Sequence, residues 1–505
     1  MRALAASALL LAALTNRPAL AAEVPATGWM PEDWRELARP IAWEEVQTFL
    51  GAVDGRGDVT VSVAGETTRG RPLYLVHVGR AGGPQASRRI LFYAQQHGDE
   101  VAGKDALLYL IRDLARDPSR MPAGVELWIL PLMNPDGAVA GTRESGAGVD
   151  LNRDHIGLQQ PETRALHEVA RRVRPHIAVD CHEFTRDPEP WVRRGWEKWP
   201  QITMDGMDNP QLDPELVAIA RRWVEESAAL EAAAGHDFFR YTVGGVPPEE
   251  ELRHSAPDLD CALNTIGTYG ALSFIVESAV RRAPETANRD LGARVDAYLV
   301  LLRRFVDGGS RWPEDGAAIE RARARPLPRW IPTNYLWVNP RGEELAFPVR
   351  VRATGERLLV PSGNWTTDLA VKKSVPAPLG WAVRPEGAAE VGALLDRHGI
   401  HYERLDAPRE VTAESCKLLR VETEFDPVYE RFEGRQIVTR DAALRRELPA
   451  GSLWVPYAGE TAVRAALLLE PTVLYGIYQL PRFAALAGAD GGLPVLRVTA
   501  VEEAR

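Results

Sequence analysis

Apolar runs and helical patterns alternate along the chain between residues 70 and 280. Helical spacing of apolar residues covers 103–115 and 162–173. Short and almost wholly apolar runs, typical of buried strands, occur at residues 73–78, 90–94, 125–131, 177–181 and 272–276. Helices that alternate with buried strands predict an α/β fold, in which helices cover both faces of one sheet.

Two stretches add to this pattern. Residues 30–50 carry apolar residues on a helical stripe and predict a helix ahead of the sheet. In residues 184–260, prolines, tryptophans and glycines surround one clear helix at Pro214–Ala234. We expect this stretch to leave the sheet as a long excursion that helps to build a binding pocket, since functional loops lie on such excursions.

The last third of the chain predicts a second region that is mostly β with some helix. Residues 311–332 are rich in Arg, Pro and Ala and mark a boundary. His398 and His401 flank Gly399, which is typical of a helix end, so a solvated pair is favoured over a metal site. The pattern predicts strands at 345–351, 357–360, 418–422 and 452–455, and helices at 385–398 and 460–469.

Length and composition limit the alternatives. With 505 residues the chain is too long for one core, which predicts two or three domains. An apolar content of 45% and a charged content of 26% are ordinary for a globular protein. The pI near 5.6 argues against a nucleic-acid partner or an anionic membrane surface.

The first residues are typical of a secretory signal peptide. Arg2 precedes the small and apolar run 3–14, and Ala19-Leu20-Ala21 fits a cleavage site. A buried first helix is the alternative, although the Asn-Arg-Pro run at 16–18 would break it. We expect cleavage after Ala21 and a secreted or periplasmic protein. No later stretch reaches the roughly 18 apolar residues that span a bilayer.

The cysteines leave two alternatives open. Cys181, Cys261 and Cys416 are too few for a disulfide scaffold. A Cys181–Cys261 bridge and buried free thiols are equally compatible with the sequence.

Two strand ends carry candidate metal ligands. His97 and Glu100 lie three residues apart at a predicted turn after the strand 90–94, and His182 follows the strand 177–181. Alone, the first pair is also compatible with an ordinary polar loop. Because ligands bind beyond the carboxyl ends of the strands in open α/β sheets, we expect the three side chains to converge. Two histidines and one carboxylate, with the fourth position left to water, form a catalytic zinc arrangement, which implies one Zn²⁺ per chain.

A zinc hydrolase also needs a base and groups that bind the substrate. Glu277 directly follows the apolar run 272–276, where a carboxylate is costly unless it has a partner or a role. It can take a proton from water and pass it to a leaving amine. Arg143 and Arg153 are fork-shaped donors that suit an oxyanion and a carboxylate, although two loop arginines are more often solvated.

The order of these motifs resembles the carboxypeptidase A family of zinc peptidases, over residues 66–282. The motifs are His97-x-x-Glu100, Asn134-Pro135-Asp136-Gly137, Arg143, Asp150-Leu151-Asn152-Arg153, His182 and Glu277. Arg71, in the sequence Arg-Gly-Arg-Pro-Leu, also resembles a family motif at the start of a strand. The resemblance implies a mixed, twisted sheet flanked by helices and a peptide as the substrate.

The resemblance also implies a role for each residue. It implies zinc ligation by His97, Glu100 and His182, orientation of a ligand histidine by Asp150, polarisation of the scissile carbonyl by Arg143, binding of the substrate carboxylate by Asn152 and Arg153, general-base action by Glu277, and substrate contacts by Arg71 and Tyr269.

The chain departs from the family at two places. The family has a mobile tyrosine well before the base, whereas Tyr269 lies only eight residues before Glu277. The Asp180-Cys181-His182-Glu183 sequence is closer to branches that include murein-peptide amidases and aspartoacylase-like deacylases. The substrate therefore need not be an ordinary protein C-terminus.

We predict a signal peptide at 1–21, a zinc peptidase domain at 22–310, a linker at 311–332 and a β-rich α+β accessory domain at 333–505. The leading hypothesis is zinc-dependent hydrolysis of a C-terminal peptide bond. The alternatives are a secreted zinc amidase or deacylase acting on cell-wall peptides or N-acyl amino acids, and a catalytically dead binding protein on the same scaffold.

Overall fold

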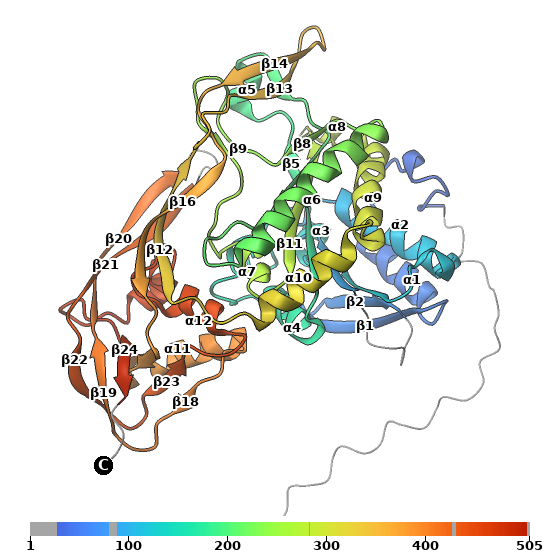
Figure 1. Cartoon of the computed structure of the whole chain (residues 1–505). Helices are drawn as coiled ribbons and strands as arrows, with labels where there is room; N and C mark the ends of the chain where they lie inside the picture. The colour runs from blue at the N-terminus through green and yellow to red at the C-terminus, as the bar shows by residue number, and fades with distance from the viewer. Residues whose placement is uncertain (1–27, 80–87, 282, 427–430, 502–505) are drawn as a thin grey trace, which may run out of the picture.

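The computed structural model describes residues 28–79, 88–281, 283–426 and 431–501 (Figure 1). The predicted signal peptide at 1–21 lies outside the described residues. The N-terminal half forms a large helix-covered sheet, and a second, smaller sheet with its own helices lies beside it, towards the C-terminus.

The larger sheet has eight strands and is mixed, as the sequence predicts. Its order is β1 (Val59–Glu66), β2 (Pro72–Val78), β4 (Val125–Leu130), β3 (Arg88–Ala94), β5 (Ile177–Thr185), β11 (Leu272–Val280), β7 (Ile202–Gly206) and β8 (Phe238–Arg240). The four central strands β4, β3, β5 and β11 are parallel, and so are β7 and β8. The other neighbours pair antiparallel.

Helices cover both faces of this sheet because successive strand side chains point to opposite sides. In β3, Ile90 and Phe92 join one core, whereas Leu91 and Tyr93 join the other. Fully burying such a side chain contributes about 1.5–3 kcal/mol. The first core includes α1 (Trp43–Val53), α2 (Ala102–Arg116), α6 (Pro214–Ala233), α9 (Leu291–Asp307) and α10 (Trp312–Ala324), and the second includes α4 (Pro161–Val173) and α7 (Ala262–Gly267).

Two N-terminal and linker predictions need correction. The helix predicted over 30–50 begins only at Trp43, because Pro40 lacks an amide hydrogen and restricts the residue before it; Trp34–Glu36 is a 3₁₀ turn. The segment 311–332, expected to be a linker, holds α10, and Ile319 of this helix is buried in the main core.

The excursion at 184–260 is completed by residues that lie far along the chain. It contains α5 (Glu189–Arg193), β6 (Trp196–Lys198), β9 (Val243–Gly244) and β10 (Leu252–Arg253), besides β7, α6 and β8. Strand β6 pairs with β13 (Leu345–Val351), which pairs with β14 (Arg357–Ser362). Strand β10 pairs with β15 (Trp365–Thr366), so segments from both halves of the chain share small sheets (Figure 1).

The C-terminal region is a β-rich α+β unit, as predicted. Its six-stranded antiparallel sheet has the order β18 (Glu403–Arg404), β23 (Leu453–Pro456), β17 (Gly380–Val383), β24 (Val495–Val501), β19 (Arg409–Glu414) and β22 (Leu444–Leu448). Helices α11 (Pro385–His398) and α12 (Ala462–Leu469) share a core with one face of this sheet. Two ribbons accompany it, β12 (Trp330–Val338) with β16 (Asp368–Pro376) and β20 (Cys416–Asp426) with β21 (Arg431–Arg440).

Short helical segments complete the described structure. They are α3 (Pro135–Ala140), α8 (Pro284–Ala287), α13 (Pro481–Ala484), and the 3₁₀ turns at Pro118–Arg120, Leu151–Arg153 and Ile477–Gln479. Within the described ranges, no helix is both long and apolar enough to cross a membrane. The cysteines are all free thiols, so the alternative of a Cys181–Cys261 bridge is wrong.

Candidate active site

The turn after β3 carries the first two predicted ligands. Gln95 adopts a left-handed backbone conformation (φ 57°), which reverses the chain directly after the strand. A Cβ at Gly98 would lie 2.1 Å from the carbonyl carbon of Gly137, so the turn packs directly on the start of α3. Asn134 supports this contact, because its amide donates to the Gln96 carbonyl at 3.1 Å. The Asn-Pro-Asp-Gly motif therefore buttresses the turn that holds His97 and Glu100.

The three predicted ligands converge. The His97 Nδ1 atom lies 2.8 Å from Glu100 Oε1, and the His182 Nδ1 atom lies 2.8 Å from Glu100 Oε2. The two Nδ1 atoms are 3.1 Å apart, and all three side chains are buried. A zinc ion about 2.0–2.1 Å from each ligand atom sets tetrahedral neighbours roughly 3.3–3.4 Å apart. The donor set and its spacing therefore fit a zinc ion, with only small side-chain movements.

Carboxylates hold the outer nitrogen of both histidines. The His97 Nε2 atom lies 3.0 Å from Asp150 Oδ1, and the His182 Nε2 atom lies 2.9 Å from Asp180 Oδ2. A carboxylate accepts the proton on Nε2 and thereby leaves the Nδ1 lone pair directed at Glu100 and the other histidine. Burial opposes ionisation of Glu100, but His97 and His182 outweigh it, so the pKa of this carboxyl lies below its ordinary value.

Three further predicted residues surround this centre. Arg143 places Nη1 3.3 Å from Glu100 Oε1 and Nη2 3.0 Å from Asp150 Oδ2, and it keeps 40% of its side chain exposed. Asn152 is fixed by the Ala262 amide, which donates to its side-chain oxygen at 2.9 Å. Arg153 donates to the Asn152 carbonyl at 2.7 Å. These two residues lie on one 3₁₀ turn, capped by the side chain of Asp150.

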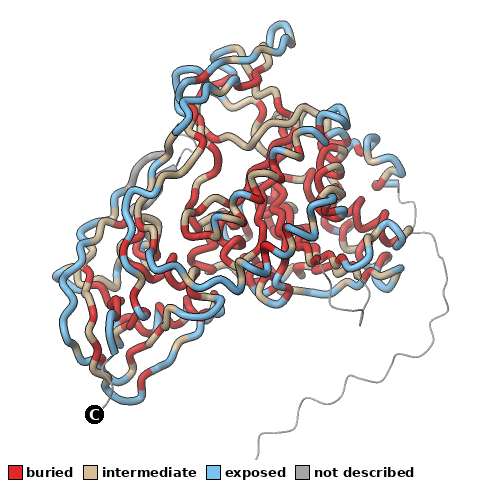
Figure 2. Tube along the Cα trace, in the orientation of Figure 1, coloured by how far each residue is buried: buried red, intermediate tan, exposed pale blue. Residues whose placement is uncertain are grey.

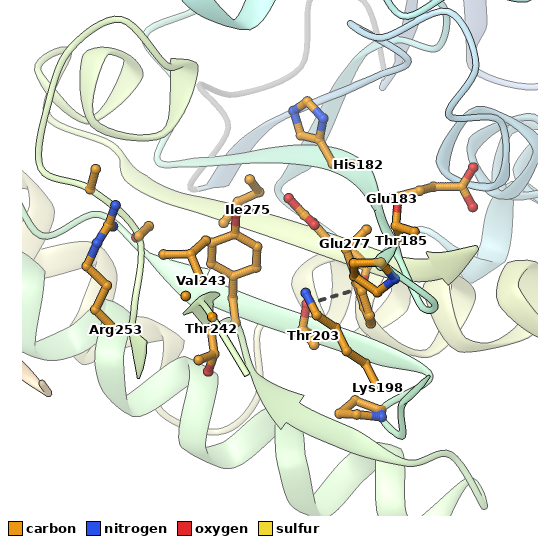
Figure 3. Close-up of a pocket in the computed structure, with 18 of the residues that line it drawn as sticks. His182, Glu183, Thr185, Lys198, Thr203, Thr242, Val243, Arg253, Ile275 and Glu277 are labelled. Carbon is orange, nitrogen blue, oxygen red and sulfur yellow. Dashed lines mark hydrogen bonds between the residues drawn. The ribbon is translucent and has the colours of Figure 1, made fainter. Parts of the chain in front are cut away.

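Glu277 is delivered by the neighbouring strand. It lies opposite His182 in the register of β11 and β5 and is only 8% exposed. Burial raises the pKa of its carboxyl to about 7; the nearby His182 opposes this shift, and Glu100 reinforces it. In Figure 3 its carboxylate points toward the side on which His182 lies. A half-neutral carboxyl beside a candidate metal centre is suited to proton transfer near neutral pH.

One cavity of about 1370 Å³ connects these groups. Its lining includes every predicted site residue except Arg71 and Tyr269. The predicted residues that line it are His97, Glu100, Arg143, Asp150, Asn152, Arg153, His182 and Glu277.

The comparisons with known proteins identify the family. Residues 54–225 match the family model of zinc carboxypeptidases. The chain is 38% identical over 404 residues to carboxypeptidase 2 of Trichophyton tonsurans, a match that covers 76% of this chain and 72% of the fungal protein. The chain belongs to the zinc carboxypeptidase family.

This family membership makes the protein a zinc metallocarboxypeptidase, a hydrolase that acts on peptides. Similar solved structures include a metallo-carboxypeptidase from Burkholderia cenocepacia, at 23% identity and a TM-score of 0.42, covering 53% of this chain and 70% of that one. A metallo-carboxypeptidase from Pseudomonas aeruginosa, in complex with (2-guanidinoethylmercapto)succinic acid, is 26% identical with a TM-score of 0.40, at the same coverage.

Two predicted substrate residues of this zinc carboxypeptidase do not line the cavity. Arg71 forms an ion pair with Asp136 of the Asn-Pro-Asp-Gly turn, so its guanidinium supports that turn. The Tyr269 hydroxyl bonds to His167 Nδ1 at 2.9 Å, on the α4 side of the sheet. The sequence motif around Arg71 marks a structural contact. Tyr269 follows α7 and packs against the core on the α4 side of the sheet, away from the cavity.

Other cavity residues were missed by the sequence analysis. Lys198, Tyr241 and Arg253 line the cavity from the excursion, and Trp337 and Tyr475 line it from the C-terminal region. Figure 3 places Lys198 near Glu277 and Arg253 farther from it. No local motif marks these positions, because they are brought together by pairings such as β10 with β15.

Proposed function

We propose that this zinc carboxypeptidase hydrolyses the C-terminal peptide bond of peptides outside the cytoplasm, with one zinc ion held by His97, Glu100 and His182. The observation that carries the proposal is the convergence of both Nδ1 atoms on the Glu100 carboxylate, at the wall of a cavity that Arg143, Arg153 and Glu277 also line. A zinc ion in such a site acts as a Lewis acid that polarises a carbonyl and makes water more acidic.

Glu277 serves as the general base in this proposal. Its carboxylate takes a proton from the attacking water and later gives it to the leaving amine. The raised pKa supports this role, because a base with a pKa near the working pH both accepts and releases a proton readily. The strand register, which places Glu277 beside His182, keeps the carboxylate close to the metal centre.

The arginines bind the two charged parts of the substrate. Arg143 lies against Glu100 and Asp150, so its exposed edge can donate to the carbonyl oxygen as negative charge develops there. Arg153 and Asn152 lie on the 3₁₀ turn Leu151–Arg153, which Asp150 caps, and hold the free C-terminal carboxylate of the substrate. This division of roles selects the last peptide bond of the substrate.

The predictions about export and domain organisation also form part of the proposal. We propose that residues 1–21 direct export and that the catalytic domain, predicted at 22–310, also includes α10 and is followed by an accessory domain at 333–505. Trp337 and Tyr475 support a contribution of the accessory region to substrate contact, because both line the cavity.

Mass spectrometry of a mixed peptide pool tests the proposal directly. The protein as purified should carry about one zinc ion per chain and release single residues from C-termini, and chelation should abolish the release. Matched peptides with an amidated C-terminus serve as the control and should stay intact. Cleavage of the amidated peptides at equal rates, or of N-acyl amino acids alone, would favour the amidase or deacylase alternative.

A further inference from the structure

A continuous chain of buried polar side chains leads away from the proposed zinc ligand His182. Asp180, which contacts the His182 Nε2 atom, also accepts from the Gln96 amide at 2.8 Å. The side-chain oxygen Oε1 of Gln96 lies 2.9 Å from His155 Nε2. The side chains of Asp180, His182, Gln96 and His155 are all buried. This chain of polar side chains thus begins at the Asp180 Oδ2 atom, which both His182 and Gln96 contact.

The chain continues through a second histidine to a tyrosine. The His155 Nδ1 atom lies 3.1 Å from His167 Nε2 on α4. The His167 Nδ1 atom lies 2.9 Å from the Tyr269 hydroxyl, which follows α7. Both histidines are completely buried. Figure 2 shows the buried interior of the helix-covered sheet in red. The path therefore crosses from the centre of the sheet to its α4 face.

One assignment of protons satisfies every contact. Asp180 only accepts, so Gln96 must donate its amide, and its carbonyl oxygen must then accept from His155 Nε2. A neutral His155 accepts at Nδ1 from His167 Nε2, and a neutral His167 accepts at Nδ1 from Tyr269. Every donor therefore points toward Asp180, and bonds aligned in one direction polarise and strengthen one another.

The neutral state of both histidines follows from their surroundings. Burial lowers the pKa of His155 to about 3, and it holds the pKa of His167 well below its usual value, with nearby cationic groups adding to the shift. A charged imidazole has no acceptor and would break the chain.

The C-terminal region holds the far end of this chain. The Arg464 guanidinium of α12 lies 3.7 Å over the Tyr269 ring. It donates to the His398 carbonyl at 2.7 Å and to Thr268 Oγ1 at 3.1 Å. His398, which ends α11, is buried and donates from Nε2 to the Ile156 carbonyl at 2.9 Å. The prediction of a solvated His398 is therefore wrong: the end of α11 packs against the loop that holds Ile156 and against His167 of α4.

We propose that the polar chain Asp180–Gln96–His155–His167–Tyr269 positions the zinc ligand His182 and that the C-terminal region, through Arg464, is a structural part of the metal site. The proposal rests on the zinc site of the proposed function. The contact from Gln96 adds a second partner at the Asp180 Oδ2 atom and so holds this atom at His182. The five residues of this polar chain are positioning residues, because His182 and not they would bind the zinc ion.

Zinc affinity and the visible spectrum of the cobalt-substituted protein test the proposal. Gln96→Leu removes the second contact to Asp180, and Tyr269→Phe removes the first donor but keeps the ring under Arg464. We expect Gln96→Leu to weaken zinc binding roughly tenfold and Tyr269→Phe about two- to fivefold, since loss of an outer partner of a metal ligand costs about 10–100-fold and the effect falls with distance. Both should shift the cobalt absorption bands.

Tyr109→Phe is the matched control. It removes a hydroxyl that donates to the Pro31 carbonyl at 3.1 Å from a fully buried ring, with no connection to His182. It should lower thermal stability but leave zinc affinity and the cobalt bands unchanged.

The outcomes separate the two proposals. A wild-type protein that binds no zinc overturns the proposed function. Wild-type protein that binds zinc, together with folded Gln96→Leu and Tyr269→Phe proteins whose zinc affinity and cobalt bands match wild type, overturns the positioning role alone. Tyr269→Phe keeps the test decisive if Gln96→Leu does not fold, because the lost atom is a single oxygen.

Discussion

Glu277 lies directly opposite His182 in the register of the parallel strands β11 and β5. Neighbouring strands are about 4.8 Å apart, and aligned residues project to the same face of a sheet. The pairing therefore gives the proposed base and a proposed zinc ligand a fixed spacing that no loop could provide. It also places Glu277 in the buried interior, which accounts for its raised pKa.

Replacing Glu277 by glutamine should separate metal binding from proton transfer. Gln is nearly isosteric but cannot accept a proton from water, so we expect kcat to fall about 10²–10⁴-fold while zinc content stays unchanged. Steady-state kinetics and metal analysis on the same preparation check this. Glu168→Gln, on the exposed side of α4, is the control and should keep full activity. An active Glu277→Gln protein would show that another group is the base.

The activity should fall on the acid side of neutrality. Burial raises the pKa of Glu277 to about 7, and a bound cation lowers it again, so ionisation should occur at or below pH 7. Only the ionised form accepts a proton, so kcat/KM should drop about tenfold per pH unit below this pKa. The measurement is kcat/KM across the pH range, with zinc content determined at each pH. A profile that stays flat down to the ordinary pKa of glutamate would contradict the role of a buried base.

Removing Arg153 should mainly affect substrates with a free carboxylate. A hydrogen bond to a charged group contributes about 1.5–3 kcal/mol, so Arg153→Ala should lower kcat/KM roughly 10–150-fold on such peptides. Peptides with an amidated C-terminus measure any general damage to the site. An equal loss on both substrates would place Arg153 outside carboxylate recognition.

Asp150→Asn should weaken the metal site without removing a ligand. Asp150 accepts from His97 and also pairs with Arg143, so its charge supports both. We expect zinc affinity to fall about 10–100-fold, which competition with a chromophoric chelator detects. Asp490→Asn removes an exposed carboxylate that pairs with Lys417 in the C-terminal region, and it should leave zinc affinity unchanged. Unaltered zinc binding in Asp150→Asn would contradict the orienting role.

Much of the catalytic half could be predicted from local patterns. The strand predicted at 90–94 lies within β3 because it is a continuous apolar run, and the helix predicted at 162–173 lies within α4 because its apolar residues have helical spacing. Prediction failed where a local pattern was ambiguous: the stripe at 30–50 continues through Pro40, which a helix interior does not tolerate. The identity of the site followed from motif order. His97 and Glu100 follow β3, whereas His182 and Glu277 lie within β5 and β11, which are its neighbours in the parallel centre of the mixed sheet.

By itself, the sequence predicted β2, β3, β4, β5 and β11 of the larger sheet, the candidate zinc-ligand motif and the family, because these depend on residue type and spacing within short segments. Only the tertiary structure decided that Arg71 and Tyr269 lie outside the cavity, that Lys198 and Tyr475 line it, and that His398 is buried. Such facts depend on which distant segments pack together, as β6 does with β13. Contacts of this kind join residues that share no local pattern, so their chemistry appears only once the chain is folded.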